Sequence, residues 1–309
     1  MIPLYNYPTW YNAGLRSNDP NRYIWDDIAA ANSRVPITAV INPSNGPGGG
    51  PPNGDYVVGL RDLRAAGVKM LGYVRTNYAN RDGLAPLSQV DTDVSLYHDH
   101  FNVDGIFLDE AASGYPTTGV DPNAIANYYK LAYDSIHSFS NPEFRSVVIG
   151  PGTRTNEEYF ARPATETSVI FENNLGWEAY IPDSYVRRYP RKNFAFLLYD
   201  VTGIKNMKHA IDLAVERNIG YVYVTDCGPS QPSCLNPWNG LPTYWEEELA
   251  HIERINAACR PPRRGGHEHE HDLAGEGSED RQNSLNRQGH TQDKCSIRSD
   301  KRERSSSRK

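Results

Sequence analysis

The sequence has little of what several protein classes need. Only four of its 309 residues are cysteine, and they form no CxxC pair, which disfavours a zinc site or thioredoxin-like chemistry. No apolar run reaches the roughly 18 residues that a membrane-spanning helix requires. No signal peptide is visible, because a strand-like segment follows Met1 at once. Asn-x-Ser/Thr acceptors for N-glycosylation are also missing.

Positive charge is scarce in the first 259 residues. Residues 260–309 hold 12 of the 32 Lys and Arg and 9 of the 38 Asp and Glu, which leaves residues 1–259 with a net charge of about −9. Such an acidic body disfavours nucleic-acid binding as the main function. Residues 260–309 have mixed charge and few large apolar side chains, so we expect a disordered charged tail after a globular domain over residues 1–259.

Two of the cysteines bracket a short flexible segment. Cys227 and Cys234 enclose Gly-Pro-Ser-Gln-Pro-Ser, whose ends could meet in a disulfide. A disulfide there would favour a secreted protein, and two unpaired thiols are the alternative.

Strand-like and helix-like segments alternate along residues 1–259. Apolar spacing predicts helices over Asp55–Ala66, Asp121–Phe139, Ile204–Asn218 and Trp245–Ala258. Short apolar runs predict eight strands, over Ile2–Tyr7, Ile37–Asn42, Lys69–Arg75, Gly105–Asp109, Ser146–Gly150, Ser168–Glu172, Phe194–Asp200 and Gly220–Asp226. Eight strand–helix units in about 260 residues favour the α/β class and a single (β/α)8 TIM barrel. A doubly wound open sheet would usually carry a nucleotide-binding fingerprint, which is missing.

Two adjacent carboxylates, Asp109 and Glu110, end one of these apolar runs. Neighbouring carboxylates are costly to bury, and the C-terminal strand ends of such barrels carry the chemistry. Cleavage of a glycosidic bond needs two opposed carboxyl groups. Glu172 ends the sixth strand and is the expected partner. We therefore predict Asp109 as nucleophile, Glu172 as general acid/base and Glu110 as an orienting or tuning group, with the roles of Asp109 and Glu110 open to exchange.

Polar and aromatic side chains follow the other strand ends. They suit a carbohydrate, because hydroxyls hydrogen-bond to polar groups and C–H faces stack on rings. Lys and His are missing from these ends, which disfavours a Schiff-base aldolase or a metallohydrolase. For Asp200 and Asp226, helix capping or loop support is an equal alternative. We expect substrate contacts from Tyr5, Tyr7, Asn42, Arg75, Asn173, Tyr199, Asp200, Tyr223, Asp226 and Trp238.

Five stretches of the sequence resemble the spherulin-4 family of fungal glycoside hydrolases. They are Ile2–Pro8, Pro36–Gly48, Gly72–Thr76, Val103–Glu110 and Phe171–Glu172, and Asn42-Pro-Ser-Asn-Gly-Pro-Gly is the most specific. The resemblance covers roughly residues 1–258. It implies a (β/α)8 barrel that cleaves galactosaminogalactan, an α-1,4-linked polymer of galactose and N-acetylgalactosamine, as a retaining endo-acting enzyme. It also implies that Asp109, Glu110 and Glu172 are the catalytic acids and that the protein is secreted or at the cell surface.

The sequence thus predicts a monomeric endo-α-glycosidase with a polysaccharide as its partner and with no metal or organic cofactor. One alternative is a spore- or cell-surface protein that binds glycan without cutting it. Another is an exo-acting α-galactosidase, if the mouth of the barrel is a closed pocket rather than a groove.

Overall fold

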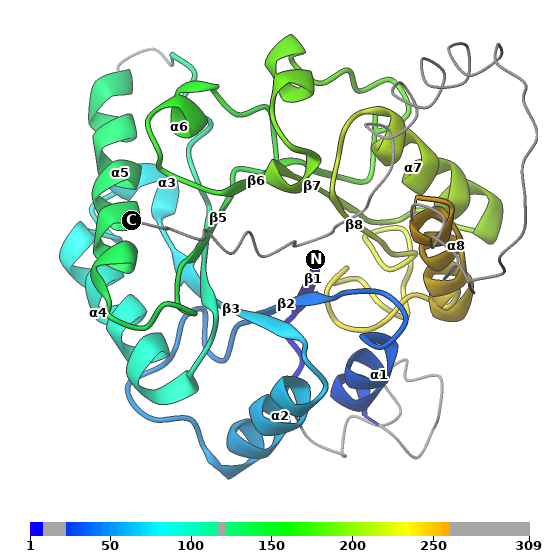
Figure 1. Ribbon diagram of the computed structural model, residues 1–309, viewed down its shortest axis with the longest axis horizontal. Coiled ribbons are helices and arrows are strands. Elements are labelled where there is room, and N and C mark those ends of the chain that lie inside the picture. Colours follow the sequence, from blue (N-terminus) through cyan, green and yellow to red (C-terminus); the bar gives the residue numbers. More distant parts are fainter. Residues whose placement is uncertain (9–22, 117–120, 260–309) are drawn as a thin grey trace, which may run out of the picture.

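One sheet of eight parallel strands is the centre of the computed structural model, which describes residues 1–8, 23–116 and 121–259. Neighbouring strands follow in chain order and bend round into a nearly closed barrel, seen along its axis in Figure 1. The expected (β/α)8 barrel is confirmed, and the expected tail over residues 260–309 lies outside the described residues. The strands are β1 (Ile2–Leu4), β2 (Thr38–Ile41), β3 (Lys69–Arg75), β4 (Gly105–Asp109), β5 (Ser146–Gly150), β6 (Thr167–Asn173), β7 (Phe194–Leu198) and β8 (Tyr221–Val224).

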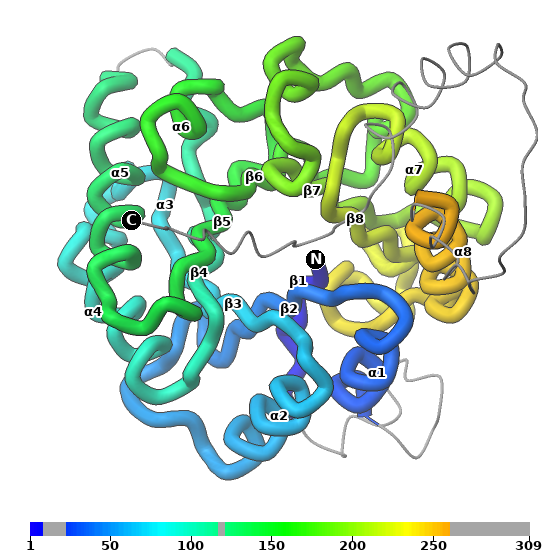
Figure 2. The backbone as a smooth tube through the Cα atoms, viewed as in Figure 1, coloured from blue at the N-terminus to red at the C-terminus, as the bar shows by residue number. Residues whose placement is uncertain are grey.

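Helices surround the strands on the outside (Figures 1 and 2). In the part of the chain that the structure describes, none of them is both long and apolar enough to cross a membrane. They are α1 (Ile24–Ala31), α2 (Gly54–Ala65), α3 (Asn77–Asn80), α4 (Leu87–Leu96) with its continuation η2 (Tyr97–Phe101), α5 (Pro122–Ser138), α6 (Glu158–Ala161), the short turns η3 (Ser184–Arg188) and η4 (Arg191–Asn193), α7 (Ile204–Glu216) and α8 (Trp245–Ala258).

The helical layer is thin on one side of the barrel. The crossover from β5 to β6 holds only the four-residue α6, and that from β6 to β7 holds only 3-10 turns. The expectation of eight full strand–helix units is wrong there. Pro182 and Pro190 interrupt the second crossover, and proline cannot continue a helix because it lacks the N–H donor.

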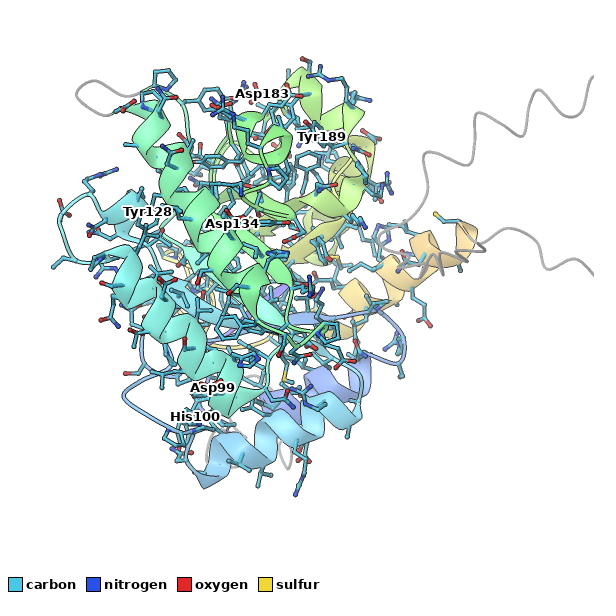
Figure 3. The ribbon with its side chains drawn as sticks, turned by 60° about the vertical axis from the view of Figure 1, so that its left-hand side comes forward. Asp99, His100, Tyr128, Asp134, Asp183 and Tyr189 are labelled. Carbon is cyan, nitrogen blue, oxygen red and sulfur yellow. The ribbon has the colours of Figure 1, made fainter. Side chains whose placement is uncertain are left out.

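The longest helix, α5, shows why the sequence pattern works elsewhere. Asp121 caps its start by accepting the Asn123 N–H at 2.9 Å, and proline stands at its first position. Its apolar side chains at helical spacing are buried against the strands: Ile125, Tyr129, Ala132 and Ile136. Figure 3 turns α5 to the front, with Tyr128 and Asp134 along its length.

Three strands end two or three residues earlier than the sequence predicts. β1 ends at Leu4, β7 at Leu198 and β8 at Val224, while β2 ends at Ile41, one residue early. For β7 the backbone gives the reason, because Asp200 has a φ of 59° and leaves the extended region.

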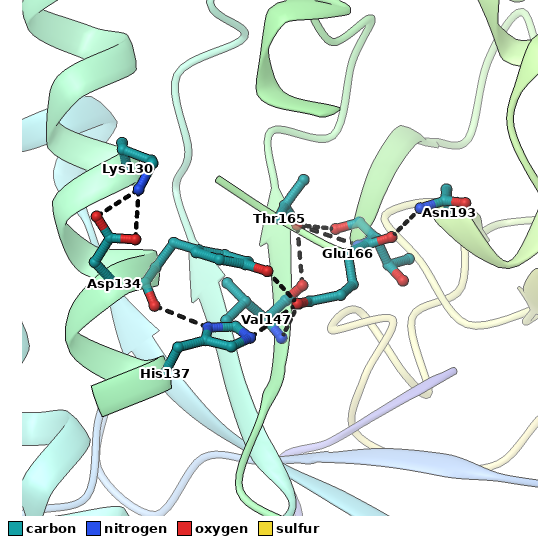
Figure 4. Close-up of polar contacts among 9 residues, drawn as sticks. Lys130, Asp134, His137, Val147, Thr165, Glu166 and Asn193 are labelled. Carbon is teal, nitrogen blue, oxygen red and sulfur yellow. Dashed lines mark hydrogen bonds and ion pairs between the residues drawn. The ribbon is translucent and has the colours of Figure 1, made fainter. Parts of the chain in front are cut away.

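One carboxylate, that of Glu166, fastens the last turn of α5 to the N-terminal ends of β5 and β6 (Figure 4). Its Oε1 accepts the Tyr133 hydroxyl at 2.8 Å and lies 3.1 Å from His137 Nε2. Its Oε2 accepts the backbone N–H of Val147 at 2.7 Å. Glu166 is therefore a structural acid at the end of the barrel where the strands begin.

Replacing Glu166 by alanine should destabilise the protein measurably. The buried Val147 N–H loses its acceptor, and an unsatisfied buried donor costs about 1–3 kcal/mol. Urea denaturation followed by circular dichroism measures the free energy of unfolding. Asp134→Ala is the control, because it breaks only an exposed ion pair with Lys130, worth under about 1 kcal/mol. An equal loss of unfolding free energy in both variants would contradict this structural role of Glu166.

Candidate active site

The carboxyl ends of the eight strands lie together at one end of the barrel, here called the mouth. Asp109 is the last residue of β4, Glu110 follows it, and Glu172 is the last residue but one of β6. β4 and β6 are the two neighbours of β5, so their backbones lie two strand spacings, or about 10 Å, apart. The three acids predicted from the sequence therefore share one mouth.

Glu110 is paired with a cation from the neighbouring strand. Arg75 Nε lies 2.8 Å from Glu110 Oε2, and the two side chains are 34% and 31% exposed. The backbone of Glu110 has a φ of 49°, so the chain turns sharply where β4 ends. The two adjacent acids therefore have different neighbours. Arg75 balances the charge of Glu110, while Asp109 faces the end of β5.

A left-handed turn, α3, lies next to the backbone of these acids, and hydrogen bonds connect the two segments. All four of its residues have positive φ angles, from 44° to 63°. This conformation costs roughly 1–2 kcal/mol for a residue with a Cβ. The Tyr78 N–H donates to the Glu110 carbonyl at 2.6 Å, and the Thr76 hydroxyl donates to the Asp109 carbonyl at 2.8 Å. Such strain persists only where surrounding contacts hold it, and it is frequent at functional sites.

A β-bulge precedes Glu172 in β6. The register against β7 shifts between Val169 and Phe171, which makes Ile170 the extra residue. The Tyr180 hydroxyl donates to the Ile170 carbonyl at 2.8 Å and satisfies this backbone oxygen. Bulges re-aim the side chains that follow them, so this one sets the direction of Glu172.

Two glycines, Gly150 and Gly152, keep the end of β5 open between the acids. A Cβ at Gly150 would lie 2.7 Å from Asp109 Oδ1, and one at Gly152 would lie 3.3 Å from Glu172 Cβ. Gly152 also has a φ of 64° and accepts the Glu172 N–H at 2.9 Å. Both acids therefore pack against the same strand end. Sequence analysis missed this role, although Gly-Pro-Gly directly after an apolar strand was the available signal.

The two facing carboxyl groups differ in how strongly they hold a proton. Burial raises the pKa of Glu172 to about 8, and the charge of Asp109 adds to the rise. Burial also raises the pKa of Asp109, but the Glu110 N–H and the Tyr73 hydroxyl donate to its carboxylate and oppose the rise. Because the charge of Asp109 acts on Glu172, Asp109 ionises first. At neutral pH we expect an ionised Asp109 opposite a protonated Glu172.

Tyrosine side chains lie close to these acids. Burial raises the pKa of Tyr5, and the charges of Asp109 and of Glu172 raise it further, so its hydroxyl lies near both carboxyls. Burial raises the pKa of Tyr199, with the charge of Glu172 as the next cause. Trp238 packs edge-on against Tyr199, with ring centroids 5.9 Å apart. Tyr5 and Tyr199, both expected to bind substrate, are therefore beside the acids.

The two further aspartates of the predicted site hold loops together. Asp200 accepts the Ser230 N–H at 3.0 Å, and Asp226 accepts the Thr243 N–H at 3.1 Å. These bonds agree with the alternative of loop support for Asp200 and Asp226.

Four other expected substrate-binding residues also bond to nearby loops or helices. The bonds run from the Gly46 N–H to Asn42 (3.0 Å), from the Leu175 N–H to Asn173 (3.1 Å), from the Tyr7 hydroxyl to Asp55 (3.0 Å) and from the Tyr223 hydroxyl to the Gly240 carbonyl (3.2 Å).

Cys227 and Cys234, in the loop after β8, are buried thiols that no disulfide joins. The Gly228 N–H donates to the Cys234 carbonyl at 3.0 Å and closes the loop. Of the two sequence-based alternatives, the one without a disulfide holds.

A family model and a curated relative point to the same family. The family model Spherulin4, described as spherulation-specific family 4, matches residues 1–252. Spherulin-4 of Physarum polycephalum is 29% identical over 267 residues, which cover 83% of this chain and 70% of the relative. A solved structure described as PhdJ bound to substrate intermediate is similar with a TM-score of 0.38 and 12% identity, over 84% of this chain and 77% of the other.

Replacing Glu172 by glutamine should stabilise the fold at neutral and alkaline pH. The folded-state pKa of about 8 lies above the ordinary value of 4.5, so stability is present below pH 4.5 and is lost as the pH rises through 8. Glutamine has the same shape without the charge. The variant should therefore avoid the loss of unfolding free energy that the wild type shows at alkaline pH, on the order of 2–4 kcal/mol.

Urea unfolding of both proteins across pH 4.5 to 8 measures the difference. The exposed-site variant Asp134→Asn should follow the wild type at every pH. If Glu172→Gln also follows the wild type, Glu172 does not carry the raised pKa.

Proposed function

The chain belongs to the spherulation-specific family 4, which confirms the resemblance seen in its sequence, and we propose that it is a retaining, endo-acting glycoside hydrolase. The proposed substrate is a galactosaminogalactan-like polysaccharide with α-1,4-linked galactose and N-acetylgalactosamine, as the family resemblance implies. One observation carries the proposal: Asp109 and Glu172 flank the same strand end, and burial and the charge of Asp109 raise the pKa of Glu172 to about 8.

The two acids divide the work of a double displacement. In the first step Glu172 gives its proton to the leaving glycosidic oxygen, while the Asp109 carboxylate attacks the anomeric carbon and forms a glycosyl ester. In the second step the ionised Glu172 takes a proton from water, and that water displaces Asp109. The order of ionisation described above supplies the protonation states that the first step needs.

Glu110 is the poorer candidate for the nucleophile. Its carboxylate is engaged with Arg75 at 2.8 Å, so attack would require that ion pair to open. Its charge nevertheless acts on Asp109, whose pKa it raises. We assign Glu110 and Arg75 to orientation of the sugar and to tuning of the nucleophile.

The aromatic residues beside the acids suit a sugar polymer. Tyr5, Tyr199 and Trp238 would bury the C–H faces of sugar rings without requiring charge on the substrate. We also propose that the protein is secreted or at the cell surface, as the family resemblance implies, and that it is a monomer.

Removing either catalytic carboxyl should slow hydrolysis strongly. Asp109→Asn and Glu172→Gln should each lower the rate of reducing-end release from purified polymer by at least about 10²- to 10⁴-fold. This is the usual contribution of a general acid or base. Asp134→Asn, on the outer face of α5, is the control with full activity.

Unchanged hydrolysis in either folded catalytic variant would refute the assignment. A wild-type chain that binds the polymer but releases no reducing ends would favour the second function, a glycan-binding surface protein.

The pH profile should report the acid. Because Glu172 must be protonated for the first step, kcat/KM should fall as the pH rises through about 8. An aryl glycoside with a good leaving group needs no proton, so this substrate should restore much of the rate of Glu172→Gln. An alkaline limb that survives in Glu172→Gln would assign the limb to another group.

A further inference from the structure

The segment Asp109–Ala112, here called the acid turn, carries the two adjacent acids out of β4. Neighbouring elements hold its backbone: the Ala111 N–H donates to the Gly150 carbonyl at 3.2 Å, and the Tyr159 hydroxyl donates to the Ala112 carbonyl at 3.0 Å. Alanine offers no polar side chain, so backbone hydrogen bonds of this kind decide where the turn lies.

Tyr129 of α5 reaches the acid turn with its hydroxyl. The Ala112 N–H donates to Tyr129 Oη at 2.8 Å, and Thr76 Oγ1 lies 3.0 Å from the same oxygen. The Thr76 hydroxyl also donates to the Asp109 carbonyl at 2.8 Å and lies 3.1 Å from the Glu110 carbonyl. Thr76 and Tyr129 are both 0% exposed, so these bonds form without competition from bulk water.

The direction of these bonds follows from the hydrogens available. A carbonyl oxygen can only accept, so the single hydrogen of the Thr76 hydroxyl goes to the backbone of the acids. Tyr129 is then the donor in its bond to Thr76, and its oxygen is free to accept the Ala112 N–H. Burial raises the pKa of Tyr129 to about 12, so the hydroxyl keeps its proton at neutral pH.

The result is a hydrogen-bond relay that starts and ends on the acid turn. It runs from the Ala112 N–H through the hydroxyls of Tyr129 and Thr76 to the Asp109 carbonyl. Bonds aligned head to tail in this way strengthen one another. The relay spans Glu110, whose φ of 49° is a conformation that surrounding contacts must hold.

We propose that Tyr129 is a positioning residue for the nucleophile: through Thr76 and Ala112 it fixes the acid turn and so aims the Asp109 carboxyl group at the substrate. This inference rests on the proposed glycosidase function. Because Tyr129 is completely buried, it acts through the backbone of the turn and not by contact with the sugar.

Tyr129→Phe tests the proposal because it removes only the central oxygen of the relay. It should lower kcat by about 10- to 100-fold and leave KM within about twofold, since a reacting group displaced by about 1 Å can cost 10²-fold in rate. The matched control is Tyr128→Phe. Tyr128 is the preceding residue on α5 (Figure 3), and its buried hydroxyl donates at 2.8 Å to the Ala85 carbonyl, outside the acid turn. The control should keep the wild-type kcat and KM.

Variants of Thr76 test the other hydroxyl of the relay. Thr76→Val removes the hydroxyl at nearly constant volume and should lower kcat as Tyr129→Phe does, whereas Thr76→Ser should recover most of that loss. Each single change breaks the same relay. The double variant with Thr76→Val and Tyr129→Phe should therefore be hardly slower than either single variant. Losses that multiply in the double variant would show two independent contacts and overturn the relay.

Hydrogen exchange of the Ala112 amide, followed by NMR in the full chain, tests the relay without substrate. The amide should exchange about tenfold faster or more in Tyr129→Phe and at the wild-type rate in Tyr128→Phe, because only the first variant removes its acceptor. The measurement remains valid if the wild type cleaves no glycan, an outcome that would refute the proposed function alone. An unchanged exchange rate in Tyr129→Phe, or an equal loss of kcat in both tyrosine variants, overturns the proposal.

Discussion

Two carboxyl groups facing each other across the end of one strand are the costly feature on which the rest of the mouth depends. Each loses hydration, and the charge of Asp109 makes ionisation of Glu172 harder. The fold tolerates this arrangement because the strand end between them carries the small residues Gly150 and Gly152. With the pKa of Glu172 raised to about 8, we expect only one of these two facing carboxyl groups to be charged at neutral pH.

The neighbouring backbone is strained in ways that serve the same arrangement. α3 keeps four residues left-handed, and its Tyr78 N–H holds the Glu110 carbonyl. The bulge at Ile170 interrupts an otherwise regular ladder just before Glu172. Each feature costs stability, and each lies next to an acid rather than elsewhere in the barrel. Strain held next to the acids is what a preorganised site requires, because the side chains must stand ready before substrate arrives.

Sequence patterns were sufficient for the order of elements and for which acids meet. The bounds of β3, β4, β5 and α8 agree with the predicted ones, because each is a continuous apolar or periodic run. Parallel strands bring their carboxyl ends together, so strand ends alone placed Asp109 and Glu172 in one mouth.

What the sequence could not give is the pairing of side chains between strands. The Arg75–Glu110 ion pair depends on the register of β3 against β4, which places Arg75 beside the end of β4. The early end of β7 depends on a single residue, Asp200, that adopts a left-handed conformation. These are tertiary contacts, and they decide which of two adjacent acids is available for chemistry.

The two glutamates at the ends of β6 show how the barrel separates stability from chemistry. Glu166, just before the strand, accepts hydrogen bonds from the Tyr133 hydroxyl and the Val147 N–H and fastens a helix. Glu172 lies near the other end of the strand, and burial and the charge of Asp109 raise its pKa. Among the described residues no hydrogen-bond donor to its carboxyl group opposes this rise. A carboxyl whose acceptors are filled contributes to the fold, whereas one left buried without donors is held at a cost in free energy. Because the cost falls on the acid that faces Asp109, it is better explained by a reaction at the mouth than by the needs of folding.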